Sequence, residues 1–194
     1  MGDCFFKRCE PTQSADFFAT PPKAVKALCK AIKFRQKIIE PCCGQGHISR
    51  TLEEHGYTVE SSDIIYRGFG KEGSYDFLKS TKDELNGFDI ITNPPFNQAQ
   101  EIIMHALSNT DMHAKIAMLL RLTFLPSKRR KILFDTYPLT ALYVFRSRIG
   151  CAPNGEFKVK PNGELYVPSA IDYAWFIWDK AKFDEGPPKI YWLE

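Results

Sequence analysis

The stretch QKIIEPCCGQGHISRTLEEH, residues 36–55, decides the class of fold. A short apolar run ends at Glu40 and is followed by a turn that contains Gly44 and Gly46. A helical pattern then runs to Gly56. Glycines between a strand and a helix allow a tight turn and a close approach of the backbone by a ligand. The stretch therefore predicts a strand, a ligand-binding turn and a helix.

This turn differs from the usual nucleotide-phosphate sites. Ser49 stands where a dinucleotide fingerprint places its third glycine, and no Gly-Lys-Ser or Gly-Lys-Thr is present for a triphosphate loop. Glu40 would repel phosphate and attract a cationic ligand. Taken alone, the motif is equally compatible with a glycine turn in a metabolic enzyme of Rossmann type.

Outward from this stretch, short apolar strands alternate with helical patterns, which predicts βαβ units and a mainly parallel sheet. Thr20 is placed to cap a first helix that has Pro21 and Pro22 in its first turn, and Ser127 to cap a short basic helix. Strands are expected at 36–40, 57–64, shortly before 75–78, and at 88–93, 115–120, 139–145 and 172–178.

The segment between the last two strands, residues 146–169, has a different character. It contains Pro-Asn-Gly twice, and residues 156–167 predict a hairpin around an Asn-Gly turn, because this dipeptide readily supplies positive φ values. We expect residues 1–194 to form a single domain in which 146–169 is a hairpin insertion and a candidate substrate-contacting element. A plain surface hairpin is the alternative.

Four polar residues fall at the ends of successive expected strands: Glu40, Asp63, Asp76 and Asn93. Ligands in open α/β sheets bind outside the carboxyl ends of the strands. Asp63 is placed to accept hydrogen bonds from both hydroxyls of a ribose, and Asp76 from an adenine amine on which Phe77 could stack. Each residue alone is more often an ordinary turn or core residue, so the coincidence of four is what indicates a site.

The sequence Asn93-Pro94-Pro95-Phe96 forms a stiff ledge after the strand at 88–93, because proline fixes its own φ and extends the residue before it. The Asn93 side-chain oxygen and the Pro94 carbonyl could accept hydrogen bonds from an exocyclic amine and restore lone-pair character to its nitrogen. Phe96 offers a stacking surface for an extruded base. The alternative is a rigid strand-to-helix connector with Phe96 as a hydrophobic plug.

Together these motifs resemble the S-adenosylmethionine-dependent methyltransferases that methylate adenine N6, and look similar to small enzymes of phages and prophages. The resemblance covers roughly residues 14–125 and includes FFATPPKAV (17–25), which looks like a further cofactor segment. It implies a Rossmann-like class I methyltransferase with a mainly parallel seven-stranded sheet, its last strand antiparallel, and helices on both faces. The cofactor implied is S-adenosyl-L-methionine, whose sulfonium methyl requires no metal.

The resemblance also assigns roles to individual residues. The catalytic residues that it implies are Asn93, Pro94, Pro95 and Phe96. The cofactor-binding residues that it implies are Phe18, Thr20, Pro21, Glu40, Pro41, Gly44, Gly46, Asp63, Ile64, Asp76, Phe77 and Asn93.

The basic residues are concentrated in one part of a chain whose net charge is only +3. Seven basic residues and a single acid, Asp135, lie between Arg121 and Arg148. A basic stripe of this kind is the electrostatic footprint of a phosphate-backbone contact, although a solvated helix face is the ordinary reading of SKRRK alone. The substrate-binding residues predicted on this basis are Arg121, Lys128, Arg129, Arg130, Arg146 and Arg148.

The composition, with 44% hydrophobic and 25% charged residues, is ordinary for a soluble protein. The N-terminus lacks the apolar stretch of a signal peptide, and no apolar run approaches the length of a membrane span. We expect a cytoplasmic protein of a bacterial cell or a phage-infected host. The six cysteines are then reduced thiols, and without a CxxC pair a zinc site is not expected.

The predicted activity is methylation of the N6 amine of adenine in DNA. Sequence-specific DNA methyltransferases usually carry a separate target-recognition domain, for which only 146–169 is available, so a partner subunit or a homodimer is a further expectation. Three alternatives stay open: an RNA N6-adenine methyltransferase, a protein glutamine N5-methyltransferase, and a cofactor-binding module without turnover.

Overall fold

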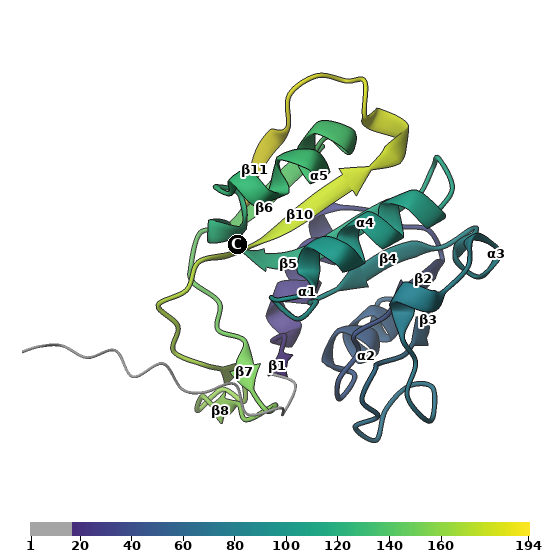
Figure 1. The fold of residues 1–194 in the computed structure, drawn as a ribbon. Helices are drawn as coiled ribbons and strands as arrows, with labels where there is room; N and C mark the ends of the chain where they lie inside the picture. The colour runs from purple at the N-terminus through teal and green to yellow at the C-terminus, as the bar shows by residue number, and fades with distance from the viewer. Residues whose placement is uncertain (1–16) are drawn as a thin grey trace, which may run out of the picture.

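The computed structural model describes residues 17–194. Cys4, Cys9 and the N-terminal stretch considered as a signal peptide lie outside the described residues. The main sheet has seven strands in the order β11-β6-β10-β5-β4-β2-β3 (Figure 1). Its strands are β2 (Lys37–Glu40), β3 (Thr58–Ser61), β4 (Asp89–Thr92), β5 (Lys115–Arg121), β6 (Ala141–Phe145), β10 (Tyr173–Asp179) and β11 (Lys189–Leu193).

The direction of these strands matches the prediction. β2 pairs in parallel with β3 and β4, β4 with β5, and β6 with β11. β10 runs antiparallel to both β5 and β6, and its register with β5 extends from Tyr173 opposite Arg121 to Asp179 opposite Lys115. The mainly parallel seven-stranded sheet is therefore confirmed, with the antiparallel strand inserted between two parallel ones.

One predicted strand is wrong, and an unpredicted strand takes the seventh place. No strand forms between β3 and Asp76, because Gly68, Gly70 and Gly73 all adopt positive φ in this segment. Asp76 instead caps the short 3₁₀ helix η1 (Phe77–Lys79), where its Oδ1 accepts a hydrogen bond from the Leu78 amide at 3.1 Å. The seventh strand is β11, at the opposite edge of the sheet.

Helices cover both faces of the sheet, as expected (Figure 1). α1 (Pro22–Ala31) and α2 (His47–Glu54) pack on one face, and α4 (Ala99–Asn109) and α5 (Lys131–Thr136) on the other. The short α3 (Lys82–Leu85) precedes β4. The strand side chains alternate between the two layers: Ile90 and Ile116 face α4, whereas Ile91 and Ala117 face α1.

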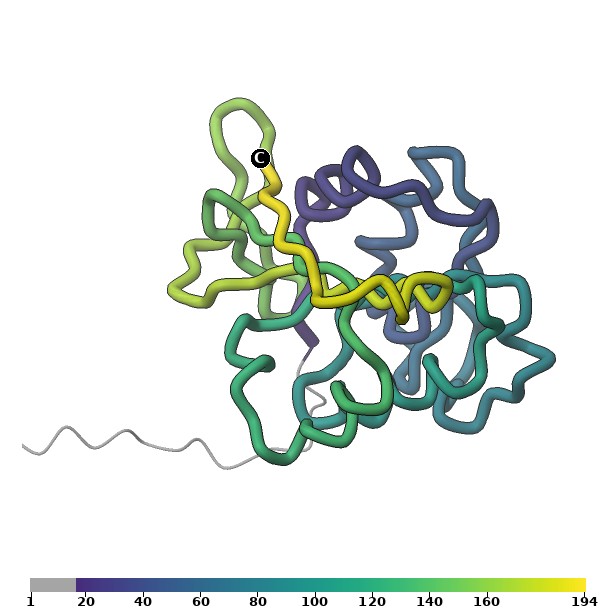
Figure 2. Tube along the Cα trace, turned by 90° about the horizontal axis from the view of Figure 1, so that it is seen from above, coloured from purple at the N-terminus to yellow at the C-terminus, as the bar shows by residue number. Residues whose placement is uncertain are grey.

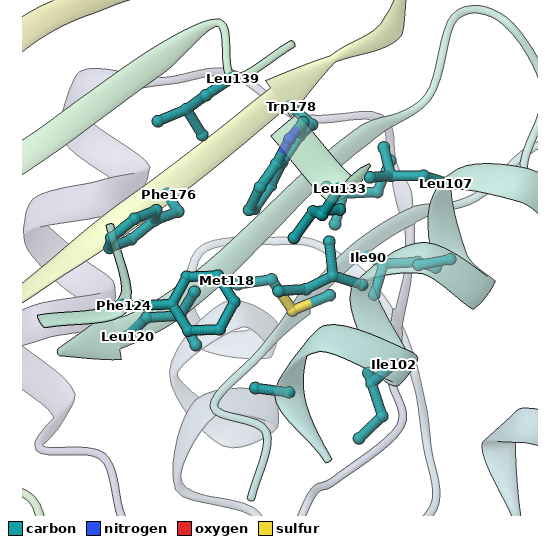
Figure 3. Packing of buried hydrophobic residues seen from close by; sticks show 14 of the residues in the cluster. Ile90, Ile102, Leu107, Met118, Leu120, Phe124, Leu133, Leu139, Phe176 and Trp178 are labelled. Atoms are coloured by element: carbon teal, nitrogen blue, oxygen red, sulfur yellow. The ribbon is translucent and has the colours of Figure 1, made fainter. Parts of the chain in front are cut away.

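The larger core layer is rich in aromatic side chains contributed by β10 (Figure 3). Phe176 and Trp178 are fully buried and lie near Phe124 and Leu133. The Trp178 indole donates a hydrogen bond to the Tyr137 carbonyl at 3.1 Å, which satisfies its polar atom inside the core. No helix of the described chain has both the length and the apolar character needed to cross a bilayer.

Two small sheets lie within and beside the 146–169 segment. β1 (Phe18–Ala19) pairs antiparallel with β7 (Ala152–Pro153), and β8 (Lys158–Val159) pairs antiparallel with β9 (Leu165–Tyr166). The second pair confirms the predicted hairpin, although only Gly163 of its Asn-Gly turn takes a positive φ. In Figure 2 this segment is the light green loop that stands out from the body of the molecule.

Candidate active site

A cavity of about 740 Å³ lies at the carboxyl ends of β2 and β4 and beside β1. Its size is in the range of small-molecule and cofactor sites. It brings together residues that are up to 85 positions apart, from Phe17 to Ile102. The predicted site residues that line it are Phe18, Thr20, Glu40, Pro41, Asp63, Ile64, Asp76, Phe77, Asn93, Pro94, Pro95 and Phe96.

Glu40 is a buried carboxyl group at the end of β2, only 1% exposed. Its Oε2 accepts hydrogen bonds from the Ser49 amide at 2.8 Å and from the Ser49 hydroxyl, which also contacts the Ser61 hydroxyl. Burial nevertheless raises the pKa of Glu40 well above its ordinary value. A buried acid on a cavity wall is best ionised when a cation occupies the cavity.

Asp63 follows β3, and its carboxylate has several partners. Oδ2 accepts from the Gly44 amide at 2.8 Å, while Oδ1 accepts from the Ile65 amide at 3.0 Å and from Arg67 at 3.3 Å. The side chain is only 11% exposed. Asp63 thus joins the glycine turn after β2 to the loop after β3, besides facing the cavity where a ribose is expected.

The two glycines of the turn do not face open space. A Cβ on Gly44 would come within 2.0 Å of the Phe17 ring, and a Cβ on Gly46 within 2.4 Å of the Phe69 ring. Both glycines have positive φ. Aromatic side chains therefore make the close approach that the sequence assigns to a ligand, and Gly44, Gly46 and Pro21 are not among the cavity-lining residues.

Asn93 follows β4, and its side-chain amide is oriented by three neighbours. Nδ2 donates to the Phe18 carbonyl at 3.0 Å, to Thr20 Oγ1 at 3.1 Å and to Cys151 Sγ at 3.8 Å. Because a carbonyl can only accept, the Phe18 contact fixes which end of the amide is NH₂. Thr20 therefore acts at the site as a hydrogen-bond acceptor for Asn93. The predicted helix cap at Thr20 is wrong, because Pro21 holds the N-cap position of α1.

Phe96 is half-buried among other rings and one guanidinium. Its centroid lies 5.7 Å from that of Phe18 and 6.5 Å from that of Tyr173, and the Arg121 guanidinium carbon lies 3.8 Å from it. Arg121 Nε is buried without a hydrogen-bond partner in the described chain. Arg121 therefore packs on the ring of Phe96, in the Asn93–Phe96 segment (the target motif), and no local pattern in the sequence predicts this contact.

None of the predicted phosphate-binding residues lines the cavity, and those other than Arg121 differ in their contacts and exposure. Arg146 pairs with Glu194 and Arg148 with Asp172, each at 2.7 Å, so two of the positive charges have acidic neighbours. Arg130 donates to the Phe124 carbonyl and covers the Phe124 ring. Lys128 and Arg129, in the 3₁₀ helix η3 (Lys128–Arg130), are exposed; Ser127 precedes them without a side-chain cap.

Several residues at or near the cavity are not among the predicted site residues. Among them, His47 lines the cavity, Ser49 holds Glu40, and Cys151 contacts Asn93. The spacing of Ser49 from Glu40 is the one local signal that indicates its role. Cys151 is 58 residues from Asn93, and no local pattern indicates that contact.

Solved structures similar to this one include methyltransferases and a modification subunit. A modification subunit of a "putative type I restriction enzyme" from Vibrio vulnificus has a TM-score of 0.61 at 12% identity, over 93% of this chain and 48% of that one. A "putative class I S-adenosylmethionine-dependent methyltransferase" from Listeria monocytogenes has a TM-score of 0.55 at 14% identity, over 90% and 64%. The 23S rRNA methyltransferase ErmE has a TM-score of 0.54 at 16% identity, over 84% and 69%.

No protein-family model matches the sequence, and no curated protein matches it. The chain spans about half the length of the first similar structure and 64% of the second. The likeness shows the fold, which is the Rossmann-like fold of class I methyltransferases. S-adenosyl-L-methionine is the cofactor expected with this fold. A buried acid, Glu40, and the imidazole of His47 on the cavity wall fit such a charged, polar ligand.

Proposed function

We propose that this protein is an S-adenosylmethionine-dependent methyltransferase that acts on the N6 amine of adenine in DNA. The observation that carries the proposal is the orientation of Asn93. Its NH₂ group is committed to Phe18 and Thr20, so its Oδ1 is left to accept a hydrogen bond from a substrate amine. Asn93 lines the same cavity as Glu40, which favours a cationic ligand.

The protein would position the substrate amine, and the methyl group would pass directly from the cofactor to this amine. Asn93 Oδ1 and the Pro94 carbonyl would each accept one N–H of the amine, and proline stiffness would keep both oxygens in place before the substrate arrives. The cofactor would supply an electrophilic methyl group. The amine nitrogen would accept this methyl group, and its surplus proton would pass to solvent.

The cofactor would occupy the part of the cavity between the glycine turn and β4. We assign the ribose to Asp63 and Ile64, and the adenine ring to Asp76 and Phe77, because these residues follow one another along the cavity wall. Glu40 would favour the positive end of the molecule. Pro41 and Phe18 complete this wall, whereas Gly44 and Gly46 would act by shaping the turn.

The nucleic acid would approach from the side of β5 and η3. Lys128 and Arg129 are exposed and carry no acidic partner in the described chain, so they are the best placed of the predicted residues to meet phosphates. Arg146 and Arg148 would have to exchange exposed ion pairs, which are weak and therefore allow the exchange. Arg121 would instead support Phe96 beneath an extruded base.

A partner subunit or a second copy of the chain remains part of the proposal. The 146–169 segment is short, and part of it is paired with β1 rather than free to contact a target. The modification subunit among the similar structures is one subunit of a putative type I restriction enzyme. Sedimentation with and without DNA would test for a second copy.

The decisive experiment incubates the full chain with tritium-labelled cofactor and separate DNA, RNA and protein acceptors. We expect label in DNA as N6-methyladenine, and Asn93→Ala should lose it while keeping cofactor affinity. Asn86→Ala, an exposed asparagine at the end of α3, is the matched control. Label in RNA or in a glutamine side chain would show that the substrate is RNA or protein rather than DNA. Retained activity in Asn93→Ala would refute the assignment of Asn93.

A further inference from the structure

The first half of the insertion, residues 151–157, reaches from the target motif to the glycine turn. At one end Cys151 accepts the hydrogen bond from Asn93. The next two residues, Ala152 and Pro153, form β7 and pair with β1. The Asn154 amide then donates to the Phe17 carbonyl at 2.8 Å. This stretch therefore packs against residues of the cavity wall, although none of its own residues lines the cavity.

At its other end the stretch meets the turn that follows β2. Gly155 lies so close to Gln45 that a Cβ on the glycine would stand 2.2 Å from Gln45 Oε1. The Phe157 ring centroid is 5.3 Å from that of His47. An aromatic side chain of the insertion is thus in contact with a ring of the cavity wall.

His47 is the first residue of α2 and lines the cavity. Its Nδ1 is buried and has no hydrogen-bond partner in the described chain. Burial, aided by the charge of Arg50, lowers the pKa of His47, so the ring is neutral at physiological pH. Phe17 lies on a further side of the ring, with centroids 6.4 Å apart. Because Nδ1 is covered by protein atoms, the ring nitrogen that a ligand in the cavity could reach is Nε2, which is not among the buried unpartnered atoms of the described chain.

The chemistry of S-adenosylmethionine limits which of its groups could bind His47. The residues assigned to the ribose and adenine lie on the loop after β3, whereas His47 lies on α2 beside the Phe17–Thr20 segment. A neutral imidazole has one donor and one acceptor nitrogen, which suits a carboxylate or an ammonium group. Only the amino-acid end of S-adenosylmethionine carries both. Arg67, which also lines the cavity, is paired with Asp63.

We propose that His47 recognises the amino-acid end of the methyl donor and that Phe157 holds the His47 ring for this task. The first half of the insertion then supports the cofactor site. Its second half, the hairpin of β8 and β9, stays available for other contacts. The inference rests on the cofactor of the proposed function and is independent of adenine as the target.

Calorimetry on the full chain tests this with two unreactive ligands. S-adenosylhomocysteine keeps the amino-acid end, and 5′-methylthioadenosine lacks it. For His47→Ala and Phe157→Ala we expect S-adenosylhomocysteine to bind about tenfold more weakly, while methylthioadenosine changes by less than about twofold. Tyr166→Ala is the matched control, because Tyr166 lies in the same insertion and does not line the cavity.

The remaining outcomes separate the possible errors. Equal losses for both ligands, or no loss for either, would overturn the inference. Phe157→Tyr should restore binding of S-adenosylhomocysteine, which excludes a folding defect as the cause. Binding of a labelled oligonucleotide without cofactor should be unchanged in Phe157→Ala, and a loss there would assign Phe157 to the nucleic acid instead. If the unaltered protein binds neither ligand, the proposed cofactor itself is wrong.

Discussion

The side-chain amide of Asn93 donates a hydrogen bond to the main-chain oxygen of Phe18, at 3.0 Å and across 75 positions of sequence. The acceptor belongs to β1, which is held in turn by its pairing with β7. The rigid segment after β4, Asn93–Phe96, is therefore held in place by a two-residue strand near the start of the described chain. This arrangement makes the amide orientation sensitive to residues outside the Asn93–Phe96 segment.

Thr20 is the first such residue, because its Oγ1 is the second acceptor of the Asn93 amide. Thr20→Val keeps the shape of the side chain and removes the acceptor. We expect kcat to fall by about two- to tenfold, as for one neutral hydrogen bond, and Thr20→Ser to restore it. Steady-state kinetics would show this, and a Thr20→Val enzyme with unchanged kcat would mean that Phe18 alone orients Asn93.

Glu40 should make cofactor affinity depend on pH. Burial raises the pKa of Glu40 in the free protein, and the free energy of unfolding therefore decreases as pH rises from its ordinary value of 4.5 towards the raised value. A cationic cofactor favours the ionised form, so binding should release a proton and strengthen with rising pH across this window. Calorimetry in buffers of different ionisation enthalpy would detect the proton. Glu40→Gln should show neither effect; a pH-independent affinity in the unaltered protein would contradict the expectation.

Arg121 and Arg129 should affect methylation in different ways. The guanidinium of Arg121 covers Phe96, so Arg121→Met should lower kcat by about fivefold and leave the salt dependence of binding unchanged. Arg129 is exposed, so Arg129→Met should weaken nucleic-acid binding and reduce the slope of log K against log salt by about one. Binding titrations at several salt concentrations would separate the two, and equal salt slopes for all three proteins would argue against a phosphate contact at Arg129.

The Arg35–Asp111 ion pair should stabilise the fold at neutral pH. Two hydrogen bonds of 2.6 and 2.8 Å join the side chains, and the Arg35 guanidinium holds the pKa of Asp111 well below its ordinary value of 3.8. This stability is present above pH 3.8 and is lost as pH falls through the lowered pKa. Asp111→Asn should therefore lower the free energy of unfolding by about 1–2 kcal/mol at pH 7.

Denaturant unfolding at pH 7 and below pH 3 measures this difference. The gap between Asp111→Asn and the unaltered protein should narrow in acid. Asp83→Asn, at an exposed position of α3, is the matched control and should have little effect at either pH. A gap of constant size across the pH range would mean that the ion pair does not cause it.

Local patterns were enough to predict the parallel part of the sheet and the residues at its carboxyl ends. Glu40 ends β2 and Asn93 directly follows β4; the apolar residues of both strands are visible in the sequence, and parallel strands bring such ends to one edge. The strand expected before Asp76 does not form for a reason that is also local, because Gly68, Gly70 and Gly73 take positive φ. β11 is mostly exposed, with a strand pattern that alternation did not reveal.

By itself the sequence determined the strand-turn-helix order and the chemical groups at each strand end, because backbone preferences and the period of apolar residues act over a few positions. Only the tertiary structure decided that Phe18, Thr20 and Cys151 orient the Asn93 amide, that Arg121 covers Phe96, and that Phe157 meets His47. These contacts join segments that are far apart in the chain. Their partners are selected by how the layers pack and by which buried polar groups need a hydrogen bond, and neither condition leaves a local pattern in the sequence.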